Sequence, residues 1–307
     1  MENKQVERKL NLDIAGAVSE LETLVKKVLP KNVMYQLLLS KGLEFDGYRD
    51  YTQNDDAGLI DWKASIRGRK LFVRKYIEER DLKFIFIIDV SDNMIFGSTE
   101  KLKCEYTAEF TAALVHLILT TGDRVGFFLF NDNIVKSRPL ELGNRQFDIF
   151  VDHISDPLNY GGISNLNKVL DGIIDMADRS TSMVFLISDF INVDESYKRK
   201  LESLASLFET VAIIVRDPLD MILPEINKEI VIEDTNTGEK LLINPEIARG
   251  IYGVNATNQL NSLKEIFKNS NIDFLELSTD KSASVEIAGF LRERIRGGRI
   301  VRIKNVH

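Results

Sequence analysis

Short apolar runs alternate with longer amphipathic segments from residue 81 onward. The runs are rich in Ile, Val and Phe, and they are Phe84–Ile88, Val125–Phe130, Met183–Ile187, Val211–Val215 and Ile272–Leu277. Between the first two runs, apolar side chains recur at helical spacing as far as Gly122, a typical helix stop. Strand, helix and strand repeated in this way predict an α/β fold with a doubly wound, mainly parallel sheet.

The segments that flank this alternation have other patterns. Residues 10–40 show helical spacing that Pro30 interrupts, which predicts two helical pieces. Residues 42–80 mix Gly, aromatic and charged residues irregularly, so this stretch is expected to pack on another part of the chain. Residues 229–244 read as two strands around a turn at 236–238, which predicts an appended β-hairpin.

Three regions follow from these patterns. Residues 1–80 form an N-terminal segment of helices and irregular chain, and residues 81–220 form the Rossmann-like α/β core. Residues 221–307 hold the hairpin insertion, the last strand and helix of the core, and a basic tail.

Composition narrows the classes of function. A chain of 307 residues with 44% hydrophobic and 28% charged residues is typical of a globular protein. The net charge of -7 disfavours a general nucleic-acid binder, and the basic tail after Arg292 is interpreted as a solvated helix end. The single Cys104 allows no intramolecular disulfide and fits a reducing compartment. No apolar run approaches the roughly 18 to 20 residues of a membrane helix, so no membrane span and a cytoplasmic location are predicted.

Oxygen-bearing side chains gather where the predicted strands end. The first run is followed by Asp89, Ser91 and Asn93, the third by Ser188 and Asp189, and a Gly-rich loop before a helix carries Ser164. The carboxyl ends of parallel strands share one edge of the sheet, where ligands of such folds bind. Three loops therefore converge on one possible site.

Carboxylate, hydroxyl and amide oxygens without His or Cys suit Mg²⁺, Mn²⁺ or Ca²⁺ and not Zn²⁺. Two carboxylates would balance a divalent charge and leave the ion able to accept one external carboxylate. Each loop also has a structural interpretation, because Ser, Asp and Asn after a strand are favoured caps of the next helix.

The chain also resembles a known family. The stretches that carry the resemblance are GLEFDGYRDYTQNDD, IDWKASIRGRKLFVRKYIEER, IIDVSDNM, GGISNL, SDF, RDPLDMILP, EDTNTGE and STD. In this order they identify the chain as a member of the family called domain of unknown function 58, whose core is a von Willebrand factor A domain with a metal-ion-dependent adhesion site.

The resemblance implies that Asp89, Ser91, Ser164 and Asp189 hold the metal, with Ser164 in the place of the usual Thr. Asn93 stands where the family pattern has a second Ser, and its amide brings an NH₂ that cannot be a ligand. This departure puts the metal affinity of the site in question and leaves the fold unaffected.

The resemblance implies a non-enzymatic adaptor that binds an acidic side chain of a protein partner through the metal. Such proteins are often paired with MoxR-class ATPases of the AAA superfamily, which assist the maturation of complexes. Candidate partner-binding residues are Asp92 and Gly162 beside the predicted metal site, and Asp61 and Trp62 in the family's hallmark segment. For the hallmark segment itself, the favoured interpretation is a structural wrap that buries Trp62 against the sheet domain.

Two alternatives stay open. In the first, the protein is a metal-free scaffold of the same fold, in which Asn93 caps the helix and the site has decayed. In the second, Asp89 is the nucleophile of a phosphotransfer enzyme. Haloacid-dehalogenase enzymes need another Asp two positions later, and this chain has Ser91 there.

Overall fold

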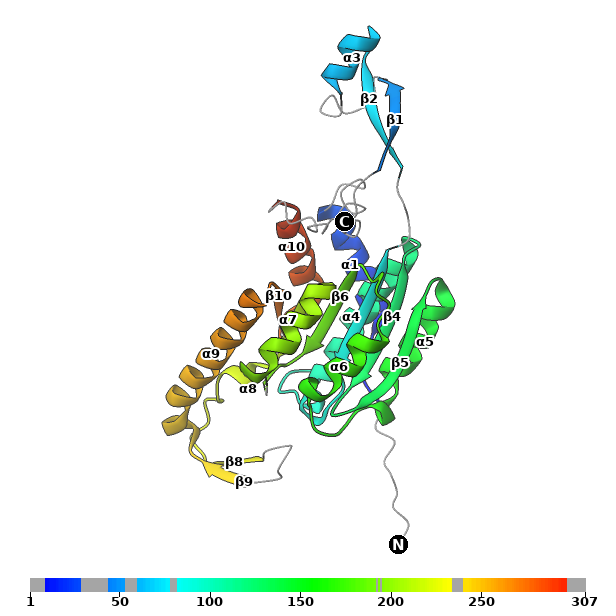
Figure 1. The fold of residues 1–307 in the computed structure, drawn as a ribbon. Helices are drawn as coiled ribbons and strands as arrows, with labels where there is room; N and C mark the ends of the chain where they lie inside the picture. The colour runs from blue at the N-terminus through cyan, green and yellow to red at the C-terminus, as the bar shows by residue number, and fades with distance from the viewer. Residues whose placement is uncertain are drawn as a thin grey trace.

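A six-stranded sheet forms the centre of the molecule in the computed structural model (Figure 1), which describes residues 9–28, 44–52, 60–77, 82–191, 193, 195–233 and 240–296. The strands are, in chain order, β3 Lys83–Asp89, β4 Arg124–Phe130, β5 Ile134–Glu141, β6 Met183–Ser188, β7 Glu209–Arg216 and β10 Asp273–Ser278. Their order across the sheet is β10-β7-β6-β3-β4-β5. All neighbouring pairs are parallel except β4 and β5.

The strand order confirms the predicted doubly wound α/β fold. Counted from β3 as the first strand of the sheet, the order is the 3-2-1-4-5-6 arrangement of Rossmann-like folds. Its direction of winding reverses between β3 and β6, and ligands of such folds bind outside the carboxyl ends of the strands at this point. The apolar runs predicted every strand of this sheet except β5, an edge strand whose side chains are mostly exposed.

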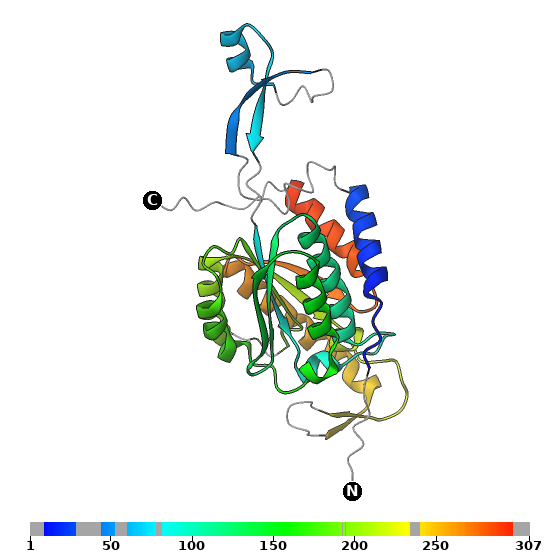
Figure 2. The same ribbon diagram turned by 90° about the vertical axis from the view of Figure 1, so that its right-hand side faces the viewer.

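Helices cover both faces of the sheet (Figure 2). One face packs against α1 Ile14–Val28, α4 Lys103–Thr120, α5 Asn144–Ser155 and α10 Ala283–Arg296. The other face packs against α6 Leu166–Met176, α7 Lys198–Leu207 and α9 Pro245–Asn269. The loops of this domain also contain short helical turns, which are η2 Asp92–Ile95, η3 Pro157–Asn159, η4 Glu195–Tyr197 and α8 Pro218–Met221.

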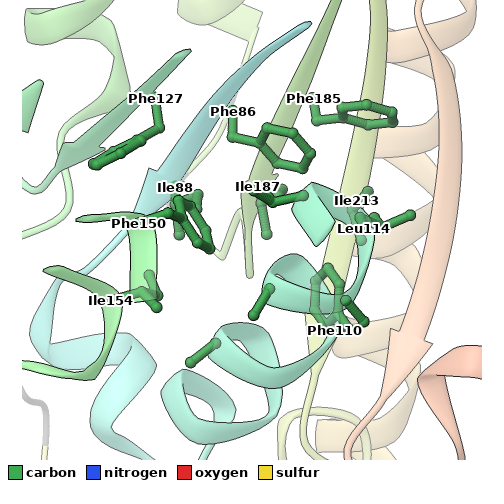
Figure 3. Packing of buried hydrophobic residues seen from close by; sticks show 14 of the residues in the cluster. Phe86, Ile88, Phe110, Leu114, Phe127, Phe150, Ile154, Phe185, Ile187 and Ile213 are labelled. Carbon is green, nitrogen blue, oxygen red and sulfur yellow. The ribbon is translucent and has the colours of Figure 1, made fainter. Parts of the chain in front are cut away.

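The central strand β3 is buried on both sides, because its side chains alternate between the two helical layers. Phe86 and Ile88 point into the layer that contains α4 and α5, where Figure 3 shows them among aromatic side chains. The ring of Phe86 stacks on Phe185 of β6, with 4.9 Å between the ring centroids. This two-sided packing holds the end of β3, and therefore Asp89, in a fixed position.

Residues 44–52 and 60–77 form a small unit of their own, which stands away from the sheet domain (Figures 1 and 2). Antiparallel strands β1 Glu44–Asp50 and β2 Phe72–Ile77 carry the short helix α3 Trp62–Gly68 between them. The expectation of irregular chain packed on the sheet domain is wrong for these residues, because the β1–β2 ladder satisfies their backbone groups locally. The predicted burial of Trp62 is also wrong, since 62% of this residue is exposed.

The chain outside the core agrees with two sequence predictions as far as it is described. The helix α1 ends before Pro30, and the second predicted helical piece lies outside the described residues. The appended hairpin consists of the antiparallel strands β8 Ile230–Glu233 and β9 Lys240–Ile243, and its turn also lies outside the described residues. Among the residues that the structure describes, no helix has the length and apolar character needed to cross a bilayer.

Candidate functional site

The carboxylate of Asp89 lies at the carboxyl end of β3, where the winding of the sheet reverses, and it is almost completely buried. The backbone N–H of Ser91 donates to Asp89 Oδ1 over 2.9 Å. The hydroxyls of Ser164 and Ser188 both donate to Asp89 Oδ2 over 2.7 Å. The structure thus brings together residues from three loops, as the sequence predicted for Asp89, Ser91 and Ser164.

Backbone hydrogen bonds join the first two loops of the site. The N–H of Asp92 donates to the carbonyl of Gly162, and the N–H of Gly161 donates to that of Val90, both over 2.8 Å. Gly162 has a φ of +82°, a conformation that glycine adopts at no steric cost. A Cβ atom at this position would also come within 2.9 Å of Asn131 Nδ2. Asp92 is half-buried and Gly162 is exposed, so both predicted partner-binding residues lie at the rim of the site.

The charges at the site act on Asp89. Burial, and after it the negative charge of Asp189, raise the pKa of the Asp89 carboxyl, while hydrogen bonding by Ser188 and Ser91 opposes the rise. A buried carboxylate next to a second carboxylate is unfavourable unless a proton or a cation compensates it. The geometry therefore favours positive charge beside Asp89.

The third loop holds Asp189 in an unusual backbone setting. Asp189 Oδ1 accepts a hydrogen bond from the N–H of Ile191 over 3.1 Å. The next residue, Phe190, has a φ of 51°, which is rare for a bulky side chain. Phe190 is buried edge-on against Phe267 of α9, with 5.2 Å between the ring centroids. Packing against α9 thus maintains the strained turn that follows Asp189.

A buried lysine links this loop to the next strand end. Lys103 Nζ, at the start of α4, donates to Asp189 Oδ2 over 2.8 Å and to Asp220 Oδ2 over 3.0 Å. The Lys103 side chain is 1% exposed. Although burial acts to lower the pKa of Lys103, the charges of Asp189 and Asp220 raise it above its ordinary value. Lys103 is therefore an internal cation of the site.

The network continues through Asp217 at the end of β7. Asp220 Oδ2 accepts from the N–H of Asp217 over 2.8 Å. Asp217 in turn accepts hydrogen bonds from Ser98, from the N–H of Leu219 and from the Thr279 hydroxyl. Although burial opposes the shift, these bonds, with those from Ser98 the strongest, hold the pKa of Asp217 below its ordinary value. Hydrogen bonds through Lys103 thus connect the ends of β6, β7 and β10.

Asp217→Asn should destabilise the protein at neutral pH by about 1 to 3 kcal/mol, because the amide leaves buried donors poorly paired. The stabilisation from a lowered pKa is complete above the ordinary carboxyl pKa near 4 and is lost as the pH falls through the lower folded value. The difference between wild type and variant should therefore shrink as the pH falls below about 4. Urea unfolding at several pH values measures it, with Asp132→Asn on the surface as the control. An undiminished difference at the lowest pH would contradict the role assigned to the Asp217 charge.

Several residues of this site were missed from the sequence, and they are Lys103, Asp217 and Asp220. Lys103 lies four and seven residues before Thr107 and Phe110, which are both buried on the inner side of α4. A lysine on the buried side of a predicted helix was the feature of the sequence that indicated a buried charge. Asn93 is buried in η2, and its role as a metal ligand stays a prediction.

The donor set fits a small divalent cation. Ser91 Oγ is buried and forms no hydrogen bond of ordinary geometry with the protein. Ser91 precedes η2, but its hydroxyl does not cap that helical turn. With the carboxylates of Asp89 and Asp189 and the hydroxyl of Ser164, it offers hard oxygen ligands of the type that Mg²⁺ prefers. No cluster of three or more His, Cys, Asp or Glu side chains suited to a metal occurs in the described ranges, so any ion here would depend on the hydroxyls.

Solved structures that align with the chain include BatB from Bacteroides thetaiotaomicron, with a TM-score of 0.47 and 13% sequence identity over 70% of this chain and 99% of that chain. The VWA domain of SpRpn10 aligns with a TM-score of 0.38 and 11% identity over 67% of this chain and 93% of that domain. Both scores are below 0.5, so the fold assignment rests on the strand order itself.

The predicted cytoplasmic location is contradicted. The chain also aligns with an aerotolerance-related membrane protein from Bacteroides fragilis, with a TM-score of 0.44 and 15% identity over 69% of this chain and 99% of that chain. A further aligned structure, from Vibrio fischeri, is described as a membrane spanning protein. Composition and the lack of long apolar runs in the sequence do not determine the location of the protein.

Relatives of known sequence share nearly the whole chain. Uncharacterized proteins of Mycobacterium bovis and Mycobacterium tuberculosis are each 26% identical to it over 291 residues, which cover 92% of this chain and 90% of the relative. The family model described as "Protein of unknown function DUF58" matches residues 47–260, more than half of the sequence. The match includes β3, the Gly-rich loop and the end of β6, which carry the candidate site. The chain therefore belongs to the DUF58 family, as its sequence motifs predicted.

Proposed function

We propose that this DUF58 protein is a binding protein that holds a divalent cation at the end of β3 and uses it to engage an acidic side chain of a protein partner. The observation that carries the proposal is the environment of Asp89. Its buried carboxylate is acted on by the charge of Asp189 and is surrounded by the hydroxyls of Ser91, Ser164 and Ser188. Mg²⁺ is the favoured ion, with Mn²⁺ or Ca²⁺ as alternatives.

The charges nearest Asp89 support this function. The carboxylates of Asp189 and Asp220 share the ammonium of Lys103, whereas the hydrogen bonds to the Asp89 carboxylate come from the neutral groups of Ser91, Ser164 and Ser188. A divalent cation beside Asp89 would compensate its negative charge. A bound ion would offer an open coordination position to an external carboxylate, and the half-buried Ser164 and Asp92 lie where a partner can approach.

One observation favours the metal-free scaffold as a second candidate. The ammonium of Lys103 already lies 2.8 Å from Asp189 Oδ2, so one of the two carboxylates has a permanent counter-ion. A role as adaptor without enzymatic activity is part of the proposal, and the pairing with a MoxR-class ATPase stays a prediction from the family resemblance.

Calorimetric titration of the chelator-treated protein with Mg²⁺ and Mn²⁺ separates the two candidates. The proposed function requires saturable binding near one ion per chain. Absence of binding with both ions would contradict the proposed metal-dependent function and favour the metal-free scaffold. Adding free glutamate after saturation with metal then tests whether the bound ion accepts an external carboxylate.

Ser91→Ala should have little effect on the stability of the metal-free protein but should weaken its binding of metal. Without metal, the free energy of unfolding should change by less than about 1 kcal/mol, because Ser91 Oγ makes no regular hydrogen bond. With metal, loss of a ligand hydroxyl should weaken binding by about tenfold or more. Calorimetry and urea unfolding on the same variant measure both effects. Unchanged metal affinity would remove Ser91 from the ligand set.

A further inference from the structure

The short helix α3 has its polar side inward and its apolar side outward. Asp61 and Ser65 are four residues apart, as are Trp62 and Ile66, so each pair lies on one side of the helix. Asp61 and Ser65 are buried, while Trp62 is 62% and Ile66 79% exposed. A helix that stabilises a fold by hydrophobic burial has the reverse arrangement.

The inward side explains how the unit maintains this arrangement. Asp61 Oδ1 caps α3 by accepting from the N–H of Ala64 over 3.0 Å, and the N–H of Asp61 donates to the carbonyl of Phe72. Ser65 Oγ accepts from the N–H of Phe72 over 2.9 Å. Polar contacts to the start of β2 therefore fix the helix, and Trp62 and Ile66 are not needed to hold it.

The unit exposes a further apolar side chain in addition to those of α3. This side chain belongs to Leu71, which follows the helix and is 45% exposed. Contiguous exposed apolar side chains commonly mark interaction sites, and Trp is enriched in the residues that dominate protein interfaces. The tip composed of Trp62, Ile66 and Leu71 is therefore a candidate docking surface.

Positive charge predominates at the tip. Lys63, Arg67, Arg69 and Lys70 are all exposed, and Lys70 lies 3.6 Å from the exposed carboxylate of Asp50 in β1. The sole acidic residue between residues 60 and 71 is Asp61, which is buried as the helix cap. Lys63 and Arg67 are four residues apart and form a basic stripe directly beside the apolar pair. The complementary surface is therefore apolar at its centre and acidic at its edge.

The size of the tip favours a protein groove over a bilayer. Binding to a membrane interface strengthens with the apolar area that a helix buries there, and α3 has 7 residues and presents only two apolar side chains. Trp and Arg are, by contrast, enriched among the dominant residues of protein interfaces, and the tip carries both. The projection of the unit away from the sheet domain in Figures 1 and 2 lets it enter a groove.

We propose that the α3 tip, formed by Trp62, Ile66 and Leu71 with Lys63 and Arg67 beside them, is a second binding surface that docks into an acidic, apolar-lined groove of a protein partner. It lies on a different unit of the chain from Asp89 and does not depend on the metal-binding function. Trp62 is the sole tryptophan of the chain, so its fluorescence reports directly on docking.

The test begins with a random peptide library displayed on phage and selected on the full chain. Peptides that also bind the double variant W62A/I66A are removed. Enriched sequences should combine Asp or Glu with aromatic or aliphatic residues, and a synthetic peptide of that consensus should shift the Trp62 emission to the blue. Ile66→Ala and the charge reversal K63E/R67E should each weaken its binding about tenfold or more, the latter with reduced dependence on salt.

Two controls keep the result specific. Leu158→Ala removes an apolar side chain that is 85% exposed elsewhere, so this variant should bind the peptide as wild type does. Thermal unfolding of each variant checks the fold, which these exposed tip positions should leave unchanged. Failure to enrich peptides over W62A/I66A, or enrichment of peptides without acidic residues, would overturn the proposal. A blue shift with phosphatidylglycerol vesicles but not with the peptide would replace the protein groove by a membrane surface.

Discussion

Lys103→Met should lower the free energy of unfolding by about 3 to 5 kcal/mol, the largest stability effect expected of a single charged side chain here. The methionine keeps most of the volume but leaves Asp189 and Asp220 without their shared ammonium, and all three side chains are nearly fully buried. Removing one partner of a buried ion pair costs this much because it leaves an uncompensated charge in the interior. Urea unfolding at neutral pH measures the change.

The surface pair of Lys168 and Asp132 provides the matched control. Its atoms are 3.0 Å apart, but Lys168 is 54% exposed, so Lys168→Met should cost at most about 1 kcal/mol. Adding Asp220→Asn to Lys103→Met should recover part of the loss, since one of the two unpaired charges is then removed. Equal, small effects of Lys103→Met and Lys168→Met would show that Lys103 does not stabilise the strand ends.

Asp89→Ala should abolish measurable divalent binding, with a loss of affinity of about 100-fold or more. The reason is that Asp89 is the central acceptor of the site and the carboxylate on which Ser91, Ser164 and Ser188 converge. Calorimetric titration with Mn²⁺ measures the loss. Without metal the same variant should also be less stable, because it leaves the Ser164 and Ser188 hydroxyls without their acceptor.

Asp89→Asn separates the role of the charge from the role of the hydrogen bonds. The amide keeps one acceptor oxygen in the same place and removes the negative charge. We expect it to lose metal binding as Asp89→Ala does while remaining closer to wild type in stability. If Asp89→Asn bound metal normally, the carboxylate of Asp89 would not be the ligand that the proposed function requires.

The sequence predicted the core of the fold well because burial on both faces leaves a continuous apolar run. Strands β3, β4, β6, β7 and β10 all follow such runs, and Asp89 and Asp189 were found as the polar residues at the ends of two of them. The edge strand β5 was missed because most of its side chains face solvent, and nothing in its apolar pattern distinguishes it from a loop.

Lys103 shows why the rest of the site could not be predicted. Its partners Asp189 and Asp220 lie 86 and 117 positions away along the chain, so no local spacing connects them. Only the parallel packing of β6 and β7 brings these two aspartates to the start of α4. The pattern of α4 could show that a lysine lies on an apolar face, but not which charges compensate it.

The sequence by itself determined the family, the doubly wound sheet and the position of the candidate site, because these depend on local periodicity and on residues adjacent in the chain. The tertiary structure decided which side of α3 is exposed. Helical spacing relates Asp61 to Ser65 and Trp62 to Ile66 equally well, and the hydrogen bonds of Asp61 and Ser65 with the backbone of Phe72 turn the polar pair inward. Orientation of this kind is set by contacts between elements, and a helical period alone carries no information about them.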